Sequence, residues 1–140
     1  MQIKICANDK YMPVYQNPGD AGADLRCAEE YEVSISPGNN QLIKTGVKVE
    51  LPDHIMASIH PRSGLAKKGI VAITGIIDCG FRGEIKVNLI NHSNQEVTIS
   101  PGDRIAQLVF NPLVRPEFQQ VDDISNSARG ECGFGSTGIK

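Results

Sequence analysis

Apolar residues in this chain recur at every second position rather than every third or fourth. Residues 46–51 read Gly-Val-Lys-Val-Glu-Leu, and residues 84–89 read Glu-Ile-Lys-Val-Asn-Leu. This alternation is typical of a β-strand with one face in a core and the other in water or against a partner. Shorter runs of the same character lie at 3–6, 32–35, 56–60, 96–99 and 104–110.

Pro-Gly pairs punctuate these runs three times, at 18–19, 37–38 and 101–102. Proline presets the second position of a turn and glycine tolerates the third, so each pair predicts a turn. Many short strands joined by turns indicate an all-β sandwich, barrel or jelly roll. The one segment with helical character is 63–68, which is long enough for a turn or two.

A length of 140 residues suits one domain, and the sequence contains no interdomain linker. The formal net charge of −2 gives no general field for nucleic acid, so a phosphate contact would need a local cluster of donors. No apolar run approaches the length of about 18 residues that a membrane helix needs, and the N-terminus does not resemble a signal peptide. The four cysteines never form a Cys-x-x-Cys spacing, which favours free thiols in a reducing, cytoplasmic compartment.

The C-terminal stretch differs in composition from the rest of the chain. Residues 125–138 are rich in glycine and serine and offer almost nothing to bury. We therefore expect a β-domain over 1–125 and a mobile arm over 126–140 that is either a disordered end or orders when a ligand binds. The arm contains anion-binding parts, namely glycine amides, the forked cation Arg129 and the hydroxyls of Ser136 and Thr137. Phe134 is its one large apolar side chain, suited to lie on a flat ring.

Two internal segments carry further candidates. Residues 61–66 place Arg62 before a short predicted helix, whose first amides would point at the same anion. Taken alone, however, this segment is better explained by a capping serine at Ser63 beside a solvated arginine. In residues 75–84, Asp78 follows two aliphatic residues that we expect to be buried and precedes a glycine-containing turn. A firmly held, partly desolvated carboxylate suits a general base, although an aspartate bonding to its own turn fits the same residues.

Carboxylates also occur where a hard divalent cation could be held, at Asp20, Asp24 and Asp103. Oxygen ligands, direct or through water, are what such a cation requires. Turn formation is an equally good explanation for Asp20 and Asp103. The histidines His54, His60 and His92 are dispersed and are interpreted as non-catalytic.

Taken together, five segments resemble, in order and over nearly the whole chain, the five motifs of the trimeric dUTP pyrophosphatase family. They are Ala21-Gly22-Ala23-Asp24-Leu25, Pro61-Arg62-Ser63-Gly64-Leu65-Ala66, Gly75-Ile76-Ile77-Asp78 with Phe81-Arg82-Gly83-Glu84, Gly102-Asp103-Arg104-Ile105-Ala106-Gln107-Leu108, and Arg129-Gly130 with Gly133-Phe134-Gly135-Ser136-Thr137-Gly138. One such segment is a moderate signal, whereas five in order are very specific. The resemblance implies a jelly-roll homotrimer with shared active sites that hydrolyses dUTP to dUMP and pyrophosphate with Mg²⁺. Such an enzyme limits uracil in DNA and supplies dUMP for thymidylate synthesis.

The resemblance also implies a role for each candidate residue. Asp78 would deprotonate the water that attacks the α-phosphorus, and Asp24 would hold Mg²⁺ through the ion's water shell. The backbone at Gly75 and Ile77 would pair with the uracil edge, and the Phe81 ring would pack on the deoxyribose. The residues that would bind the phosphate chain or close over the nucleotide are Arg62, Ser63, Gly64, Gln107, Arg129, Phe134, Gly135, Ser136 and Thr137.

Two positions depart from the family pattern. Phe81 stands where the family usually has tyrosine, which keeps the ring and loses only the phenol, so we expect selection against a 2′-hydroxyl to survive. Cys132 stands where the family often has glycine and restricts the backbone of the arm.

Two alternatives remain. A dCTP deaminase shares the fold, but it needs a glutamate acid/base near the base ring and is usually longer. A non-catalytic trimeric nucleotide-binding module would also keep the fold, although an intact set of Asp24, Asp78 and Arg129 argues against it.

Overall fold

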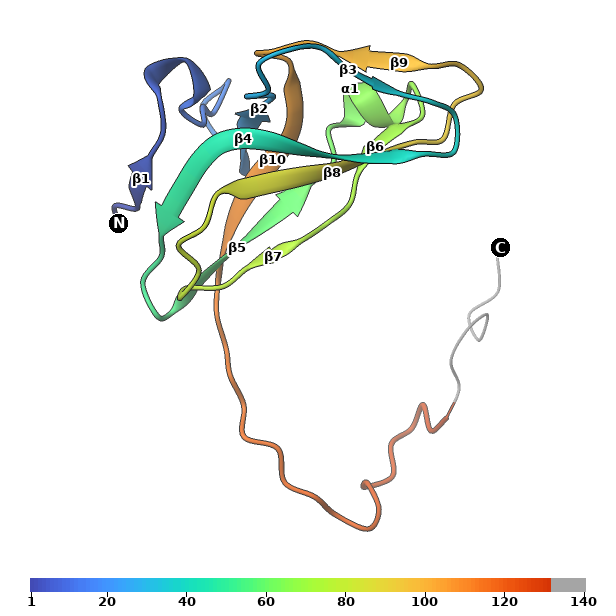
Figure 1. Cartoon of the computed structure of the whole chain (residues 1–140). Helices are drawn as coiled ribbons and strands as arrows, with labels where there is room; N and C mark the ends of the chain where they lie inside the picture. Colours follow the sequence, from blue (N-terminus) through green and yellow to red (C-terminus); the bar gives the residue numbers. More distant parts are fainter. Residues whose placement is uncertain (132–140) are drawn as a thin grey trace.

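A computed structural model describes residues 1–131 and contains ten strands and two short helices within that range. The strands are β1 (Lys4–Cys6), β2 (Gly22–Arg26), β3 (Val33–Ile35), β4 (Asn40–Glu50), β5 (Ile55–His60), β6 (Ile70–Ala72), β7 (Ile76–Ile77), β8 (Ile85–Asn91), β9 (Val97–Ile99) and β10 (Arg104–Pro112). The helices are the 3₁₀ turn η1 (Asp9–Tyr11) and α1 (Ser63–Ala66). The all-β prediction is confirmed (Figure 1).

The strands form two four-stranded sheets and one small pair. One sheet has the order β1-β4-β8-β6, the second has the order β2-β10-β5-β7, and β3 pairs with β9. All these pairings are antiparallel, as a jelly-roll-like fold requires.

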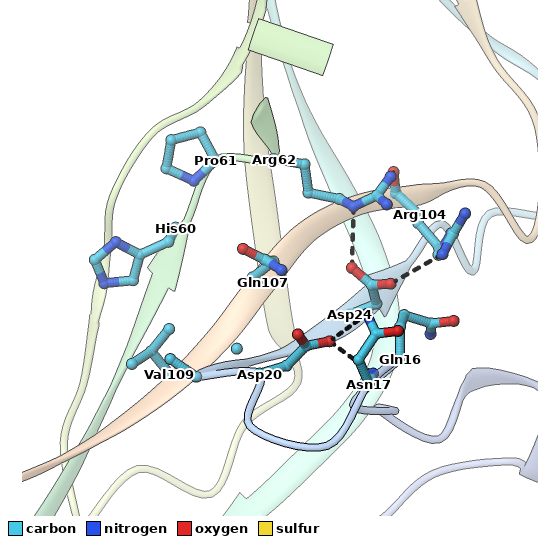
Figure 2. A pocket seen from close by; sticks show the side chains of 12 residues that line it. Gln16, Asn17, Asp20, Asp24, His60, Pro61, Arg62, Arg104, Gln107 and Val109 are labelled. Atoms are coloured by element: carbon cyan, nitrogen blue, oxygen red, sulfur yellow. Dashed lines mark hydrogen bonds and ion pairs between the residues drawn. The ribbon is translucent and has the colours of Figure 1, made fainter. Parts of the chain in front are cut away.

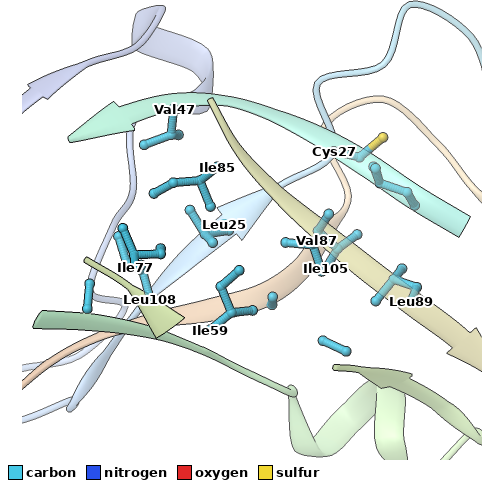
Figure 3. Packing of buried hydrophobic residues seen from close by; sticks show 14 of the residues in the cluster. Leu25, Cys27, Val47, Ile59, Ile77, Ile85, Val87, Leu89, Ile105 and Leu108 are labelled. Atoms are coloured by element: carbon cyan, nitrogen blue, oxygen red, sulfur yellow. The ribbon is translucent and has the colours of Figure 1, made fainter. Parts of the chain in front are cut away.

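The core fills the space between the two large sheets (Figure 3). Leu25, Leu108 and Ile59 enter it from the second sheet, and Val47 and Val87 enter it from the first. These side chains are the apolar half of each alternating strand, so the period-two pattern marks the side of each sheet that faces the core.

All seven predicted strand segments are present, most with bounds shifted by a residue or two. Three strands were not predicted: β2, β6 and β7. Residues 22–25 of β2 are all buried, so both of its faces are covered and the strand shows no alternation. β6 and β7 are too short, at three and two residues, to show a period.

The predicted helix is shorter than expected, because α1 covers four residues rather than 63–68. Its N-cap is Arg62, which has extended backbone angles and makes no capping hydrogen bond through its side chain. The interpretation of Ser63 as the capping residue was therefore wrong, since Ser63 already lies in the first turn.

Beyond β10 the chain runs away from the sheets as an extended segment (Figure 1). Residues 114–131 are all exposed, including four apolar side chains at Val114, Phe118, Val121 and Ile124. The candidate residues Phe134, Gly135, Ser136 and Thr137 lie outside the described residues. Within residues 1–131, no helix is long and apolar enough to cross a membrane.

Candidate active site

A pocket of about 720 Å³ opens where β2 and β10 meet the turn that leads into α1 (Figure 2). Three of its polar residues lie side by side across the sheet, because Gln107 of β10 is the register partner of both Asp24 on β2 and His60 on β5. Asp24 and Gln107 come from two separate sequence segments, and the antiparallel ladder brings them together on one face.

Two arginines surround the Asp24 carboxylate at this pocket. Arg62 Nε lies 3.0 Å from Oδ1 and Arg104 Nη1 lies 3.3 Å from Oδ2, while the Asp24 side chain is only 2% exposed. Arg62 also donates from Nη1 to the Arg104 backbone carbonyl at 3.0 Å. The two cations exceed the charge of this one carboxylate, so positive charge remains around Asp24 and suits an anionic ligand, while the Asp20 carboxylate also lines the pocket.

One oxygen of Asp24 has unused acceptor capacity. The Arg62 contact to Oδ1 is an ion pair without hydrogen-bond alignment, and Oδ1 accepts no hydrogen bond from residues 1–131. A buried acceptor without a donor is costly, so a donor from a ligand or an ordered water would be accommodated here.

The other carboxylates considered for a metal have turn roles. Asp20 Oδ2 accepts from the Asn17 backbone N–H at 2.8 Å, and Asp103 Oδ2 accepts from the Ser100 backbone N–H at 2.8 Å. Within the described residues, no group of three or more His, Cys, Asp or Glu side chains could hold a metal ion by itself.

A second pocket of about 240 Å³ lies between β7 and β8, and Gly75, Ile77, Asp78 and Phe81 all line it. The strand that leads to Asp78 is short, pairing Ile77 with Ala57 and Ile76 with Ser58 on β5. Ile59 on β5 donates its backbone N–H to the Gly75 carbonyl at 2.9 Å, which fixes the start of this loop.

Asp78 is more open than expected from its sequence context. Ile77 is buried, but Ile76 is 69% exposed because β7 is an edge strand and Ile76 faces away from the core. The Asp78 side chain is exposed, and its carboxylate accepts no hydrogen bond from residues 1–131. The expectation of a firmly held carboxylate is therefore wrong within residues 1–131.

The two pockets are separate sites in one subunit and share no lining residue. β2 and β7 form opposite edges of the second sheet, with β10 and β5 between them. At about 4.8 Å per strand spacing, these edges are about 14 Å apart. Arg62 and Gln107 line the first pocket, whereas Ser63 and Gly64 are exposed residues that line neither pocket, and Arg129 lies far along the exposed segment.

Several residues of the first pocket were not assigned a site role from sequence, and His60 and Arg104 are two of them with defined side-chain contacts. His60 makes a 2.9 Å hydrogen bond between its Nε2 and Ser58 Oγ, and Arg104 pairs with Asp24. For Arg104 a signal existed, since it lies three residues before Gln107 in the same segment. For His60 the signal was only its position directly before 61–66.

Comparison with known proteins settles the family. The family model described as dUTPase matches residues 8–138, which is nearly the whole chain. The chain belongs to the dUTPase family. A relative named deoxyuridine 5′-triphosphate nucleotidohydrolase, from Thermobifida fusca (strain YX), is 47% identical over 99% of this chain and 78% of its own length.

Solved structures of the family share the fold. A dUTPase of Staphylococcus bacteriophage 80alpha, solved with dUPNHPP, superposes with a TM-score of 0.89 at 31% identity and covers 99% of both chains. An Asp-to-Asn mutant dUTPase from phage phi11 of S. aureus, described as revealing the coordination of a structural Mg(II) ion, gives a TM-score of 0.81 at 26% identity. That match covers 90% of this chain and 100% of the phage chain.

Proposed function

We propose that this dUTPase hydrolyses dUTP to dUMP and pyrophosphate through attack of water on the α-phosphate. The observation that carries the proposal is the pocket at Arg62 and Arg104, two cations beside a buried carboxylate, in a chain of the dUTPase family. The product dUMP would feed thymidylate synthesis, and removal of dUTP would limit uracil in DNA. The cytoplasmic location expected from the thiols stays a prediction.

The base and sugar belong, in this proposal, at the pocket between β7 and β8. Backbone groups of Gly75 and Ile77 would meet the uracil edge, and the Phe81 ring, which is 42% exposed, would cover the deoxyribose. Asp78 lines the same pocket and would accept the proton of the attacking water. Its freedom from other hydrogen bonds within the described residues leaves both oxygens available for that task.

The phosphate chain belongs at the pocket between β2 and α1. Arg62 and Gln107 line it, and Ser63 and Gly64 follow Arg62 directly. Arg129, Phe134, Gly135, Ser136 and Thr137 would close over the nucleotide from the arm. Charge neutralisation, positioning and exclusion of water would then supply most of the rate enhancement.

The separation of the two pockets supports a homotrimer in which each active site is shared among subunits. Within one subunit, Asp78 and Arg62 line different pockets, because Arg62 follows the end of β5 whereas Asp78 follows Ile77 of β7, which pairs with Ala57 further back along β5. The exposed apolar residues of 114–131 further support association, since Phe118 is 97% exposed and is not buried by any of the residues 1–131.

Magnesium fits this chain as a substrate-borne ion. The described residues offer no set of three ligands, but Asp24 presents a buried oxygen with unused acceptor capacity at the phosphate pocket. Asp24 would therefore hold the ion through a metal-bound water, and the phosphate oxygens would supply the direct ligands. When bound, Mg²⁺ would neutralise phosphate charge and orient the chain for attack.

A product assay tests the proposal and separates it from the alternatives. The purified chain is incubated with MgCl₂ and, in separate reactions, dUTP or dCTP, and pyrophosphate, dUMP and ammonia are measured. The proposed hydrolase releases pyrophosphate and dUMP in equal amounts. A deaminase acting on dCTP would release ammonia, and a binding module would release none of these products. Absence of pyrophosphate from dUTP, with a folded trimer confirmed by mass, would reject the proposal.

A further inference from the structure

An irregularity in β4 is tied by hydrogen bonds to the loop that carries Asp78 and Phe81. The β4–β8 ladder pairs Lys44 with Lys86 and then Val47 with Ile85, so two residues of β4 have no partner on β8. These residues are Thr45 and Gly46. Gly46 has φ +68°, and a Cβ there would lie 3.3 Å from both Ala28 and Tyr11 side-chain atoms, so a side chain at this position would be strained and glycine is favoured.

The polar groups that this bulge leaves unpaired are satisfied at the start of β8. Gly46 donates its backbone N–H to Glu84 Oε1 at 2.8 Å. The fully buried Thr45 donates its hydroxyl to the Ile85 carbonyl at 2.6 Å. Because buried backbone donors need partners, the Glu84 carboxylate is fixed in place by the bulge.

The loop before Glu84 is braced internally. Phe81 N–H donates to the Asp78 carbonyl at 3.0 Å, and Arg82 Nη1 donates to the carbonyls of Cys79 and Phe81 at 2.7 and 2.9 Å. The Phe81 ring lies over Gly83, where an added Cβ would come within 2.6 Å of the ring. Asp78 and Phe81 therefore belong to one compact unit, held by β7 at one end and by Glu84 at the other.

We propose that Glu84 is a positioning residue whose carboxylate, bonded to the Gly46 amide, sets how the unit of residues 78–83 is held over the nucleotide. This inference rests on the proposed function, since it assigns Asp78 and Phe81 their tasks. Loss of the Glu84 contact frees one end of the unit. Asp78, the general base, and the Phe81 ring, which covers the sugar, would then shift together. Glu84 lines the same pocket, which places its effect at the site rather than at a remote part of the fold.

The proposed hydrogen bond requires a side chain long enough to place an acceptor oxygen at the Gly46 N–H, and it does not require a negative charge. A glutamine at this position keeps the length and an oxygen for the Gly46 N–H, but it has no charge. An aspartate keeps the charge and is one methylene shorter. The pair E84Q and E84D therefore separates positioning through Gly46 from an electrostatic role of the carboxylate. Glu96, an exposed residue whose carboxylate accepts a hydrogen bond from the Ser36 hydroxyl at 3.3 Å and which lines neither pocket, supplies the control E96A.

The experiment measures kcat and kcat/KM for dUTP and UTP in wild type, E84Q, E84D and E96A, together with urea unfolding curves and the hydrogen-exchange rate of the Gly46 amide. We expect E84D to lose about ten- to a hundredfold in kcat for dUTP, the scale of a small misplacement, and to discriminate less against UTP. E84Q should retain most of the activity on dUTP, the preference for dUTP over UTP, and the slow hydrogen exchange of the Gly46 amide. E96A should match wild type.

Two outcomes would overturn the inference. In the first, E84Q loses as much kcat for dUTP as E84D does. The charge of the carboxylate, rather than the position of its oxygen, would then be the cause of the loss. In the second, E84D loses stability or Gly46 protection while kcat and the dUTP-to-UTP ratio stay at the wild-type values, which makes the bond merely structural. A wild-type chain that does not hydrolyse dUTP overturns the proposed function instead. In that case the Gly46 exchange rates still report whether Glu84 holds the bulge, and the relative affinities of dUMP and UMP replace the kinetic ratio.

Discussion

Phe81 donates its backbone N–H to the carbonyl of Asp78 at 3.0 Å, so the ring and the carboxylate are the two ends of one tight turn. Both side chains line the pocket between β7 and β8. A ring that covers a sugar and a carboxylate that faces a water must keep a fixed separation, and a hydrogen-bonded turn provides it. The loop can therefore combine substrate choice and water activation in four consecutive residues.

The first prediction concerns Asp78 as the general base. Asp78→Asn keeps the shape of the side chain and removes the proton acceptor, so turnover of dUTP should fall at least about a hundredfold. Binding of a non-hydrolysable dUTP analogue, measured by calorimetry, should stay near wild type. Near-normal turnover in the Asn variant would contradict the assignment of Asp78. Asp53→Asn, which changes an exposed aspartate elsewhere on the surface, is the matched control.

The second prediction concerns the sugar. The Phe81 ring should occupy the space that a 2′-hydroxyl needs, so kcat/KM for UTP should be far below that for dUTP. Phe81→Ala should narrow this gap by at least about tenfold, because it removes the steric contact. Phe81→Tyr keeps the ring and should preserve the gap. Similar kcat/KM values for both nucleotides in the wild-type chain would refute the steric explanation.

Sequence patterns predicted those strands that have one buried face and one exposed face, because only these show an alternation of apolar and polar residues. Apolar and polar residues alternate along β4 and β8, and both strands were predicted. β2 is covered on both faces, so its sequence shows no such alternation. The β4 bulge could not be predicted, since Gly46 looks like the first residue of a regular strand. Its partner Glu84 lies 38 residues away, and only the folded sheet brings the two together.

The candidate site was predictable mainly through the family motifs, because local chemistry left each segment ambiguous. The ion pair of Asp24 with Arg104 spans 80 positions of sequence, and no local pattern indicates it. The exposure of Asp78 was also missed, because two preceding isoleucines suggest burial on both sides. Whether an edge strand such as β7 is covered depends on neighbouring chains, which the order of residues in one chain does not reveal.

The third prediction concerns pH. Cys27 is fully buried just after β2, and its backbone N–H donates to the Asp103 carbonyl at 2.8 Å, beside the turn that precedes β10. Burial is the main cause that raises the pKa of its thiol above the ordinary value of 9.0, and the charges of Glu29 and Asp103 add to it against an opposing hydrogen bond from the Glu29 backbone. Above that ordinary value the unfolded chain releases the Cys27 proton while the folded chain keeps it. The stabilisation is thus complete below about pH 9 and is lost as pH rises toward the folded pKa.

Urea unfolding between pH 8 and pH 11 tests whether the free energy of unfolding falls as the pH rises. The free energy of unfolding should fall with pH more steeply in wild type than in Cys27→Ala, by at most about 1.4 kcal/mol per pH unit for one proton. Cys6→Ala removes an exposed thiol and should keep the wild-type slope. Equal slopes in wild type and Cys27→Ala would contradict the prediction.

The last prediction is that Asp78 and the C-terminal arm act in trans. Within one subunit, Asp78 lines the pocket at β7, and residues 114–131 run exposed away from both large sheets. Two inactive variants test the arrangement: Asp78→Asn, and a truncation after Asn126 that removes the arm. If the site is shared, a mixed trimer regains an intact site wherever a truncated subunit supplies Asp78 and an Asn-variant subunit supplies the arm.

The expected recovery follows from the closed ring. In random mixing of equal amounts, the chance that one subunit is truncated and its arm-donating neighbour carries the Asn variant is about one quarter, so about a quarter of the sites should work. The two variants are unfolded, mixed and refolded together, and dUTP hydrolysis is compared with each variant refolded alone. If Asp78 and the arm act within one subunit, every site lacks one of the two. No recovery in trimers whose mixed composition is verified by mass would therefore rule out the shared site.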